Sequence, residues 1–491
     1  MAEQSLIPAA LENWVNGAFA PALGGATVAK LSPVDGRQLC TLPRSQAADV
    51  AAAVAAAKAA QPAWAATPAV TRGMALLRVV RLMEDRADQL ARIVAAETGK
   101  SVKDARGEVG GAAALGLFYA SEGQRLYGRT TTSGMAGRVA MTVRRPIGVA
   151  GLIIAANTPI ANVAWKVFPA LICGNTAVLK AAEDTPATAW FFARLAAEAG
   201  LAAGVLNVIH GLGPEAGAAL VAHPDVGVVS FTGSTAAGRE IQRVGTERFA
   251  RVSLELGGKN PLVVCDDADL DLAVKWTVLS AFSNAGQRCA AAGRVIVFDA
   301  VYEAFRAKLL AATAALKVGP ADSDDFGPVI NERQLNRMLA QLTAAREAGA
   351  TVLCGGARLG GPAHAAGCYL APTILENVAP EAAVSCTELF GPITILYRVP
   401  GFAAAIELAN RSPYGLTASV HTRDVNRALA FAERVQAGTV TVNGGTYGSE
   451  PHMPFGGFKQ SGNGTREPGT EALDVYSELQ NLYLNGNPGV A

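Results

Sequence analysis

Hydrophobic and polar positions in the first quarter of the chain alternate with the period of a helix. Residues 46–66 form an Ala-rich helical segment. Apolar residues recur at helical spacing over 70–99, opposite a mixed-charge face, and this pattern stops near Gly99. A third helix is predicted within 102–126. The pattern therefore indicates a helical N-terminal region of roughly 125 residues.

The pattern changes at Arg145 and Pro146, where it predicts a strand, a turn and a second strand. Beyond this point, short runs rich in β-branched residues alternate with helical segments. Strands are predicted at 175–181, 204–210, 226–232 and 251–256, and helices at 160–174, 185–200, 214–223 and 234–245. Such alternation indicates βαβ units on a buried parallel sheet with right-handed crossovers.

Residues from 256 to about 475 repeat the alternation with longer pieces and indicate a second α/β domain. Strands are predicted at 261–265, 293–298 and 351–356, and helices at 268–283 and 301–316. Two further segments read as strands without a partner nearby in sequence, a hairpin at 128–145 and the tail at 479–491. They can pair between subunits, which covers exposed strand edges, or extend the chain's own sheets. The pattern alone leaves both alternatives open.

Composition and charge narrow the class of protein. Half of the 491 residues are hydrophobic, and 42 basic residues balance 41 acidic ones, so no electrostatic reason favours nucleic acid or an anionic membrane as a partner. The longest apolar run is about half the ~20 residues that span a bilayer. The N-terminus lacks the basic and apolar regions of a secretory signal. We expect a cytoplasmic protein whose near-zero net charge tolerates self-association.

The seven cysteines form no CxxC pair and the five histidines no HxxxH pair, which argues against a disulfide framework and against a metal site. One cysteine stands out by its context. Cys289 lies in "SNAGQRCAAAGRV", with no histidine within forty residues on either side. A free thiol, with a pKa of about 8.5, is a weak nucleophile at neutral pH. Any chemistry at Cys289 therefore needs activation by another group.

Two Gly-rich turns separate predicted strands from helices, at 210–217 and 231–238. Glycines in such turns admit a pyrophosphate to the helix N-terminus, although many only make a tight turn. Gly233 and Ser234 form the better candidate because the turn also carries a hydroxyl donor. Lys180 and Glu183 end another strand, where they suit either a ribose diol or a solvated turn.

Two polar residues in or after apolar strands are candidates for catalysis. Glu255 lies in an apolar strand, where burial raises the pKa of a carboxyl and suits a general base; a structural salt bridge is the alternative. Asn157 follows another strand, where its amide can donate to an oxyanion. Its position before Thr158, a proline and a helix also suits an N-cap.

Taken together, these motifs resemble the NAD(P)-dependent aldehyde dehydrogenase superfamily over nearly the whole chain. The matching stretches, in order, are "KAAEDTP", "FTGSTAAG", "LELGGKNP", "GQRC", "ELFGPI", "NRSPYGLTA" and "PFGGFKQSGNG". The 34 residues between Glu255 and Cys289 are the separation usual in that family. The resemblance implies a Rossmann-type cofactor domain, an α/β catalytic domain and a small β oligomerisation element.

The resemblance also implies domain boundaries and partners. It assigns 1–126 and 147–255 to the dinucleotide-binding domain, 256–475 to the catalytic domain, and 127–146 with 476–491 to oligomerisation strands. The expected partners are a small-molecule aldehyde and NAD, with NADP as the alternative cofactor. A homodimer or homotetramer is expected, without a nucleic acid or membrane partner.

Residue roles follow from the matched positions. The resemblance implies Cys289 as nucleophile, Glu255 as base for the hydrolytic water, Asn157 as oxyanion donor and Lys166 as a group that tunes the thiolate. The expected cofactor contacts are Lys180, Glu183, Gly213, Gly233, Ser234, Leu256, Glu388 and Phe390. The expected substrate pocket contains Thr158, Trp165, Arg288 and His452. Glu183 favours NAD, because its carboxylate would meet the 2′-phosphate of NADP.

The expected reaction is oxidation of an aldehyde to a carboxylic acid through a thiohemiacetal and a thioester that water hydrolyses. Arg288 and His452 can receive a carboxylate, which suits a semialdehyde such as α-ketoglutarate semialdehyde. The sequence departs from the family pattern at Ala156 and Thr158, where many members carry tryptophan and phenylalanine. The alternatives are a CoA-acylating enzyme, which generally lacks the glutamate at position 255, and a catalytically silent binding protein.

Overall fold

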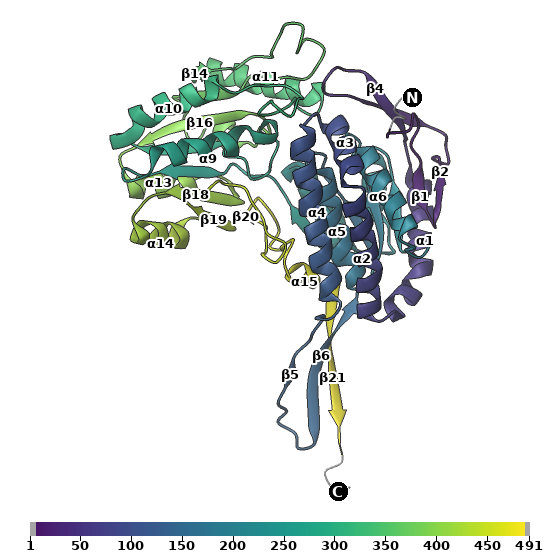
Figure 1. The fold of residues 1–491 in the computed structure, drawn as a ribbon. Coiled ribbons are helices and arrows are strands. Elements are labelled where there is room, and N and C mark those ends of the chain that lie inside the picture. Colours follow the sequence, from purple (N-terminus) through teal and green to yellow (C-terminus); the bar gives the residue numbers. More distant parts are fainter. Residues whose placement is uncertain (1–5, 487–491) are drawn as a thin grey trace.

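The computed structural model describes residues 6–486 and arranges them as two α/β lobes with a narrow arm (Figure 1). Each lobe is built on a seven-stranded sheet, and the arm is a three-stranded sheet that projects away from both lobes. Residues 1–5 and 487–491, which include the end of the predicted tail strand, lie outside the described residues. The domain boundaries given above stay a prediction.

The first lobe contains the strands predicted between residues 149 and 256. In order across the sheet, they are β11 (Arg251–Glu255), β10 (Val226–Thr232), β7 (Val149–Ile153), β8 (Thr176–Lys180), β9 (Leu206–Ile209), β1 (Asn13–Val15) and β2 (Ala18–Ala20). The first five are parallel, as predicted. The short strands β1 and β2 were not predicted; they extend the sheet with antiparallel pairing.

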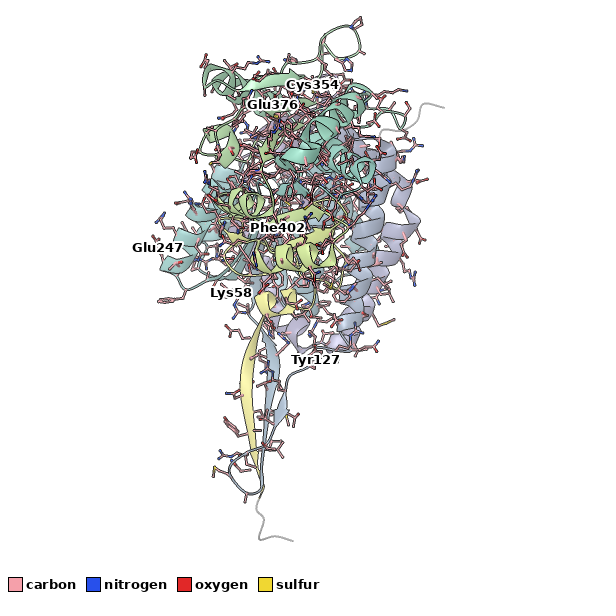
Figure 2. The ribbon with its side chains drawn as sticks, turned by 90° about the vertical axis from the view of Figure 1, so that its left-hand side faces the viewer. Lys58, Tyr127, Glu247, Cys354, Glu376 and Phe402 are labelled. Atoms are coloured by element: carbon pink, nitrogen blue, oxygen red, sulfur yellow. The ribbon has the colours of Figure 1, made fainter. Side chains whose placement is uncertain are left out.

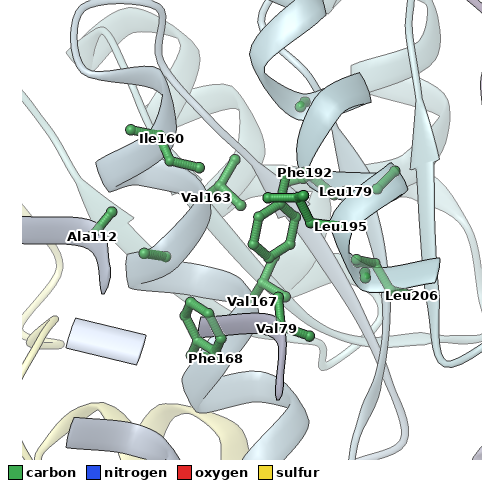
Figure 3. Packing of buried hydrophobic residues seen from close by; sticks show 14 of the residues in the cluster. Val79, Ala112, Ile160, Val163, Val167, Phe168, Leu179, Phe192, Leu195 and Leu206 are labelled. Atoms are coloured by element: carbon green, nitrogen blue, oxygen red, sulfur yellow. The ribbon is translucent and has the colours of Figure 1, made fainter. Parts of the chain in front are cut away.

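Helices cover both faces of this sheet, because successive strand residues point to opposite sides. Val178 of β8 packs in the cluster that contains α1 (Ala47–Ala66), whereas its neighbour Leu179 packs against α5 (Pro159–Ile172) and α6 (Pro186–Glu198). Figure 3 shows Val167 and Phe168 of α5 in this second cluster. The buried position of both faces explains why the strands are almost wholly apolar.

Four further helices belong to this lobe: α2 (Ala69–Asp85), α3 (Ala87–Thr98), α4 (Val102–Glu122) and α8 (Thr235–Glu247). A π-helical turn at Gly213–Gly217 leads into α7 (Ala218–Ala222). The single helix predicted over 70–99 is wrong, because Arg86 leaves the helical conformation (φ −110°, ψ 21°) and divides it into α2 and α3. No proline or glycine marks the break. Gly99 ends α3 in the left-handed conformation, as the pattern indicated.

The second lobe repeats the architecture. Its strands are, in order, β14 (Thr351–Cys354), β15 (Thr373–Glu376), β16 (Ile393–Val399), β13 (Arg294–Phe298), β12 (Pro261–Val264), β18 (Thr417–His421) and β19 (Thr439–Val442). Only β14 is antiparallel to its neighbour. The helices are α9 (Leu270–Phe282), α10 (Tyr302–Ala314), α11 (Glu332–Glu347), α12 (Ala383–Cys386), α13 (Phe402–Asn410) and α14 (Val425–Arg434).

The remaining elements connect these bodies. They are the hairpin of β3 (Thr27–Leu31) and β4 (Gln38–Pro43), the pair β17 (Tyr414–Gly415) and β20 (Phe458–Lys459), a 3₁₀ turn at Asp299–Val301, and α15 (Ala472–Tyr476). No helix in the described part of the chain combines the length and apolar character needed to cross a membrane.

The arm joins the two strand segments that lacked a partner in sequence. β6 (Arg138–Pro146) pairs antiparallel with β21 (Ser477–Asn485) along the full length of both strands, and β5 (Thr130–Thr131) pairs with β6. The segments thus pair with each other and do not extend the sheets of the lobes. Figure 2 shows the arm extending beyond Tyr127 at its base.

Candidate active site

A cavity of about 520 Å³ opens between helices α4 and α5 of the first lobe and loops of the second lobe. Charged and small residues of α4 and its N-terminal approach line one side, and the residues around Cys289 line another. The cavity contains Asn157, Thr158, Trp165, Arg288 and Cys289. Residues that are more than a hundred positions apart in sequence therefore share one cavity.

The loop that carries Cys289 has an unusual backbone. Asn284, Ala285 and Gly286 all adopt left-handed conformations, with φ of 55°, 54° and 64°. A Cβ added to Gly286 would lie 2.0 Å from the carbonyl oxygen of Gly391. Glycine is required there by this close approach, because any side chain would push the loop off the neighbouring backbone.

Asn260 fixes the backbone on the other side of the nucleophile. Its Nδ2 donates to the carbonyl oxygens of Cys289 (2.8 Å) and Ala291 (2.9 Å), while its Oδ1 accepts from the backbone N–H of Thr417 (3.0 Å). Gln287 accepts from the N–H of Ile330 (2.9 Å). Asn260 lies within the quoted "LELGGKNP" stretch, but nothing in that motif distinguished it as a contact of Cys289.

The amide of Asn157 faces this loop. Its Nδ2 donates to the carbonyl oxygen of Gln287 (2.9 Å), which leaves the second N–H of the amide for another acceptor. The N-cap alternative is wrong, because Thr158 is the N-cap residue of α5, and Glu108 accepts from the N–H of Ile160 (3.0 Å). Asn157 is therefore positioned as a donor beside Cys289.

Sequence reasoning missed the ion pair that supports this arrangement. Lys100 Nζ lies 2.6 Å from Glu108 Oε2, and both side chains are only 6% exposed. Lys100 also donates to the carbonyl oxygen of Asn157 (2.9 Å). The pair thus fixes both the backbone of Asn157 and the N-terminus of α5. Its only signal in the sequence was the position of Lys100 directly after Gly99.

Glu255 lies at the end of β11 with 4% of its surface exposed. Neither carboxylate oxygen has a hydrogen-bond partner within residues 6–486, so the salt-bridge alternative is wrong. Burial, reinforced by the charge of Glu467, raises the pKa of Glu255 well above its ordinary value. A Cβ at Gly456 would lie 2.8 Å from Oε1, so glycine is what lets the loop approach the carboxylate.

Lys166 is fully buried, and its ammonium is bound to other groups than the thiol. Nζ lies 2.9 Å from Glu467 Oε2 and 2.6 Å from Ser230 Oγ. The charge of Lys166 also acts on Glu255, where it opposes the rise in pKa. Lys166 therefore interacts with the carboxylates of Glu467 and Glu255. Glu467, the partner, had no signal in the sequence.

The Cys289 thiol is partly exposed but lies in an environment that disfavours the thiolate. Burial, together with the charges of Glu388 and Glu255, raises the pKa of the thiol to about 12, and Arg288 opposes this rise. The thiol is therefore protonated at neutral pH. A nucleophilic role requires a base to remove its proton as it reacts.

Four of the expected cofactor residues, Lys180, Glu183, Gly233 and Ser234, lie at or just after the carboxyl ends of β8 and β10, the two neighbours of β7. Lys180 Nζ lies 2.8 Å from Glu183 Oε2. Burial acts to raise the pKa of Glu183, but the Lys180 ammonium outweighs it and lowers that pKa. An ionised carboxylate held on a lysine at a strand end fits a ribose diol.

The Gly233–Ser234 turn fits a phosphate group. Ser234 caps α8 by accepting from the N–H of Ala237 (3.4 Å). The hydroxyls of Thr232 and Thr235, on either side of the turn, are buried without a hydrogen-bond partner in the described residues. Free hydroxyls at a helix N-terminus suit an anionic ligand.

Glu388, another expected cofactor contact, carries a charge that acts on the Cys289 thiol. It accepts from the N–H of Gly258 (3.2 Å), and burial raises the pKa of its carboxyl to about 7. A Cβ at Gly257 would lie 2.1 Å from its Oε2. Phe390 adopts a left-handed backbone (φ 57°) beside the Gly391 contact of the nucleophile loop.

The two other expected cofactor residues are placed differently. Gly213 begins the π-helical turn, where its Cβ position faces open space. Leu256 is buried, and its side chain packs where a Cβ of Gly238 would otherwise lie. The side chain of Leu256 therefore belongs to the packing of α8 on the sheet.

Three of the four expected pocket residues line the cavity. Trp165 packs edge-on against Phe455 with ring centroids 5.3 Å apart, and Arg288 stacks over Tyr447 at 4.8 Å. The Nε of Arg288 is buried without a hydrogen-bond partner in the described part of the chain. His452 does not line the cavity; its side chain is 59% exposed and faces Glu450.

Comparison with known proteins agrees with this geometry. A family model described as "Aldehyde dehydrogenase family" matches residues 20–482. The chain is 36% identical to an α-ketoglutaric semialdehyde dehydrogenase of Bacillus subtilis, over 96% of this chain and 97% of that protein. It is 38% identical to an NADP⁺-dependent succinate-semialdehyde dehydrogenase of Escherichia coli, over 96% and 97%. A betaine aldehyde dehydrogenase of Staphylococcus aureus in complex with NAD⁺ superposes with a TM-score of 0.95 at 29% identity, covering 97% of this chain and 95% of that one.

Proposed function

The chain belongs to the aldehyde dehydrogenase family, and on this premise we propose that it oxidises a semialdehyde to a dicarboxylic acid, with Cys289 as nucleophile. The family establishes NAD(P)-dependent oxidation of an aldehyde. One observation supports the assigned roles above all others. A thiol and an amide with a free N–H, on Cys289 and Asn157, line one cavity, and the charge of an unpaired buried carboxylate, on Glu255, acts on that thiol.

In the first step, Glu255 accepts the proton of the Cys289 thiol, and the sulfur attacks the aldehyde carbon. The resulting oxyanion accepts hydrogen bonds from the free N–H of Asn157 and from the backbone N–H of Cys289. Donors held in advance in this way are typically worth about 3–4 kcal/mol each in the transition state. The raised pKa of the thiol is the reason that this step needs a base.

Residues after β8 and β10, together with Glu388, would hold the cofactor. Lys180 and Glu183 would bind a ribose, the N-terminus of α8 would bind the pyrophosphate, and Glu388 would bind the ribose nearer to Cys289. When bound, a nicotinamide cofactor supplies the hydride acceptor that the oxidation needs. The protein holds the loop that carries Cys289 in place, because the backbone at Gly286 is in direct contact with the backbone at Gly391.

Hydrolysis of the thioester then requires a water molecule and a base. Glu255 suits this role once the thiol proton has left it for solvent, because its carboxylate has no competing partner and its pKa is raised by burial. The thiolate that departs from the thioester regains a proton from the carboxylic acid product. Transfer of the acyl group to water distinguishes this enzyme from a CoA-acylating one. The presence of Glu255, whose charge acts on the Cys289 thiol, favours water as the acceptor.

Arg288 supports a substrate with a distal carboxylate. Its guanidinium lies inside the cavity, stacked on Tyr447, and its buried Nε lacks an acceptor. A carboxylate would satisfy this donor with a charge-assisted hydrogen bond. The names of two relatives, an α-ketoglutaric and a succinate semialdehyde dehydrogenase, agree with this chemistry. The exposed His452 has no part in this proposal.

Two substitutions separate the chemical steps. We expect Cys289→Ala to abolish aldehyde oxidation while NAD binding, followed by fluorescence titration, is retained.

Glu255→Gln should slow turnover by about 10²-fold or more, as loss of a general base does, and should remove the fall in kcat as pH is lowered through the raised pKa of Glu255. Wild-type turnover in the Ala variant, or an unchanged acid limb in the Gln variant, contradicts these roles.

Substrate choice tests Arg288. Arg288→Met should lower kcat/KM for succinic and α-ketoglutaric semialdehydes by about 10–100-fold, the value of one charge-assisted hydrogen bond, and leave hexanal unchanged. The matched control is Lys103→Met, which removes another positive charge from the cavity wall. An equal loss for hexanal, or an equal effect of the control, argues against a specific carboxylate contact.

Cofactor choice tests Glu183. We expect NAD to be preferred, because a carboxylate at the ribose repels the 2′-phosphate of NADP. Glu183→Gln should therefore lower the ratio of kcat/KM for NAD to that for NADP by at least about tenfold. Glu215→Gln changes a carboxylate on the adjacent turn, paired with Arg44, and should leave the ratio unchanged. A wild-type preference for NADP overturns the assignment.

The arm supports self-association as a dimer or tetramer. β21 is an edge strand of the arm sheet, and Leu479, Tyr483 and Leu484 are each at least half exposed. Light scattering should give a multiple of the 50.4 kDa chain mass. Leu484→Asp should shift the mass toward a smaller species, whereas Leu429→Asp, at an exposed leucine of α14, should not. A monomeric wild-type protein contradicts the proposal.

A further inference from the structure

On the proposed function, the amide of Asn157 must meet an oxyanion that forms only during the reaction. Its Nδ2 donates to the carbonyl oxygen of Gln287 (2.9 Å), and this bond orients the amide. The backbone carbonyl oxygen of Asn157 accepts from Lys100 Nζ (2.9 Å) and from Asn284 Nδ2 (3.3 Å). Asn284 and Gln287 belong to the loop that carries Cys289, whereas Lys100 comes from the segment before α4 and brings a positive charge.

The ammonium of Lys100 is held in place by Glu108. The two charged groups lie 2.6 Å apart, and both side chains are only 6% exposed. The other oxygen of Glu108 accepts from the backbone N–H groups of Ile160 (3.0 Å) and Ala161 (3.4 Å) at the N-terminus of α5. The carboxylate is therefore fixed on α5, and it fixes the lysine that binds Asn157.

The residue before Lys100 lies against the second lobe. A Cβ at Gly99 would lie 2.4 Å from Pro328 Cγ, so the two segments are in close contact. Gln287 binds the same segment, because its Nε2 donates to the carbonyl oxygen of Pro328 (3.3 Å). Lys100 holds the backbone of Asn157 and Gln287 holds its amide. Both groups are thus supported by one segment of the second lobe.

We propose that Lys100 is a positioning residue for the oxidation: its bond to the carbonyl oxygen of Asn157 holds the amide where the oxyanion forms. Lys100 acts through Asn157 and touches no substrate, although it lies on the cavity wall. Misplacement of a reacting group by about 1 Å can cost roughly 10²-fold in rate. Loss of the bond should therefore slow the reaction of any aldehyde, with or without a distal carboxylate.

The variants separate this bond from the charge of the ion pair. Lys100→Met alone would leave Glu108 buried without its partner, which is costly to the fold. The main variant is therefore Lys100→Met/Glu108→Gln, which is uncharged and keeps an oxygen for the N-terminus of α5. The matched control is Arg106→Met/Asp88→Asn, which removes an exposed ion pair of the same helix, α4. Both double variants are also made in the Asn157→Ala background, and thermal unfolding checks that each is folded.

The measured quantity is the rate constant of NADH formation in the first turnover, with saturating NAD⁺ and either succinic semialdehyde or hexanal. The Lys100→Met/Glu108→Gln variant should be about tenfold slower with both aldehydes, because the amide remains but is misplaced. Its affinity for NAD⁺, followed by fluorescence titration, should be unchanged. Asn157→Ala should itself be about 10²-fold slower, and the Lys100→Met/Glu108→Gln change should then cause no further loss. The control should match its parent in both backgrounds.

A further loss of the same size in the Asn157→Ala background shows that Lys100 acts independently of Asn157, and it overturns the proposal. A loss with succinic semialdehyde alone also overturns it, because Lys100 would then be a contact of the substrate carboxylate. An unchanged rate, or an equal loss in the control, has the same consequence. Wild-type turnover in Asn157→Ala overturns instead the oxyanion role of Asn157 in the proposed function.

Discussion

The contact between the nucleophile loop and the backbone at Gly391 is the constraint on which the active site depends. Three consecutive left-handed residues end at Gly286, and the loop lies so close to the neighbouring chain that no side chain fits between them. This contact fixes the position of Cys289 in the cavity. Asn260 and Asn157 then hold the loop from two sides through its carbonyl oxygens. The strained backbone is stable because the surrounding lobes determine it completely.

The charges around the site divide into paired and unpaired groups, and the division matches their roles. Lys100 with Glu108 and Lys166 with Glu467 are buried ion pairs that support backbone and balance charge. Glu255, equally buried, has no partner for either oxygen. An unpaired buried carboxylate is costly to a fold, and its raised pKa is what a base near neutral pH requires. The structure thus places its electrostatic cost at the carboxylate that we propose as the base.

Local pattern and motif predicted the elements well where one physical cause dominates. Strands of the two parallel sheets are buried on both faces, so their apolar runs are visible in sequence, and Gly99 ends its helix as expected. The break at Arg86 was not predictable, because no proline or glycine marks it in the sequence. Lys100 and Glu467 were missed for a related reason. Glu467 pairs with Lys166, 301 residues away, and Lys100, besides Glu108, binds the backbone of Asn157, 57 residues away. Nothing local distinguishes either residue from a surface charge.

The sequence by itself determined the family and the order of the α/β units, and it predicted the reacting residues, because these depend on local periodicity and on residue type at fixed motif positions. The tertiary structure decided which side chains share the cavity. It placed Arg288 inside the cavity and His452 outside, and it bound Lys166 to Glu467. It also paired the two strands of the arm with each other. Side-chain direction and long-range pairing are set by how the lobes pack, and a one-dimensional pattern does not contain that information.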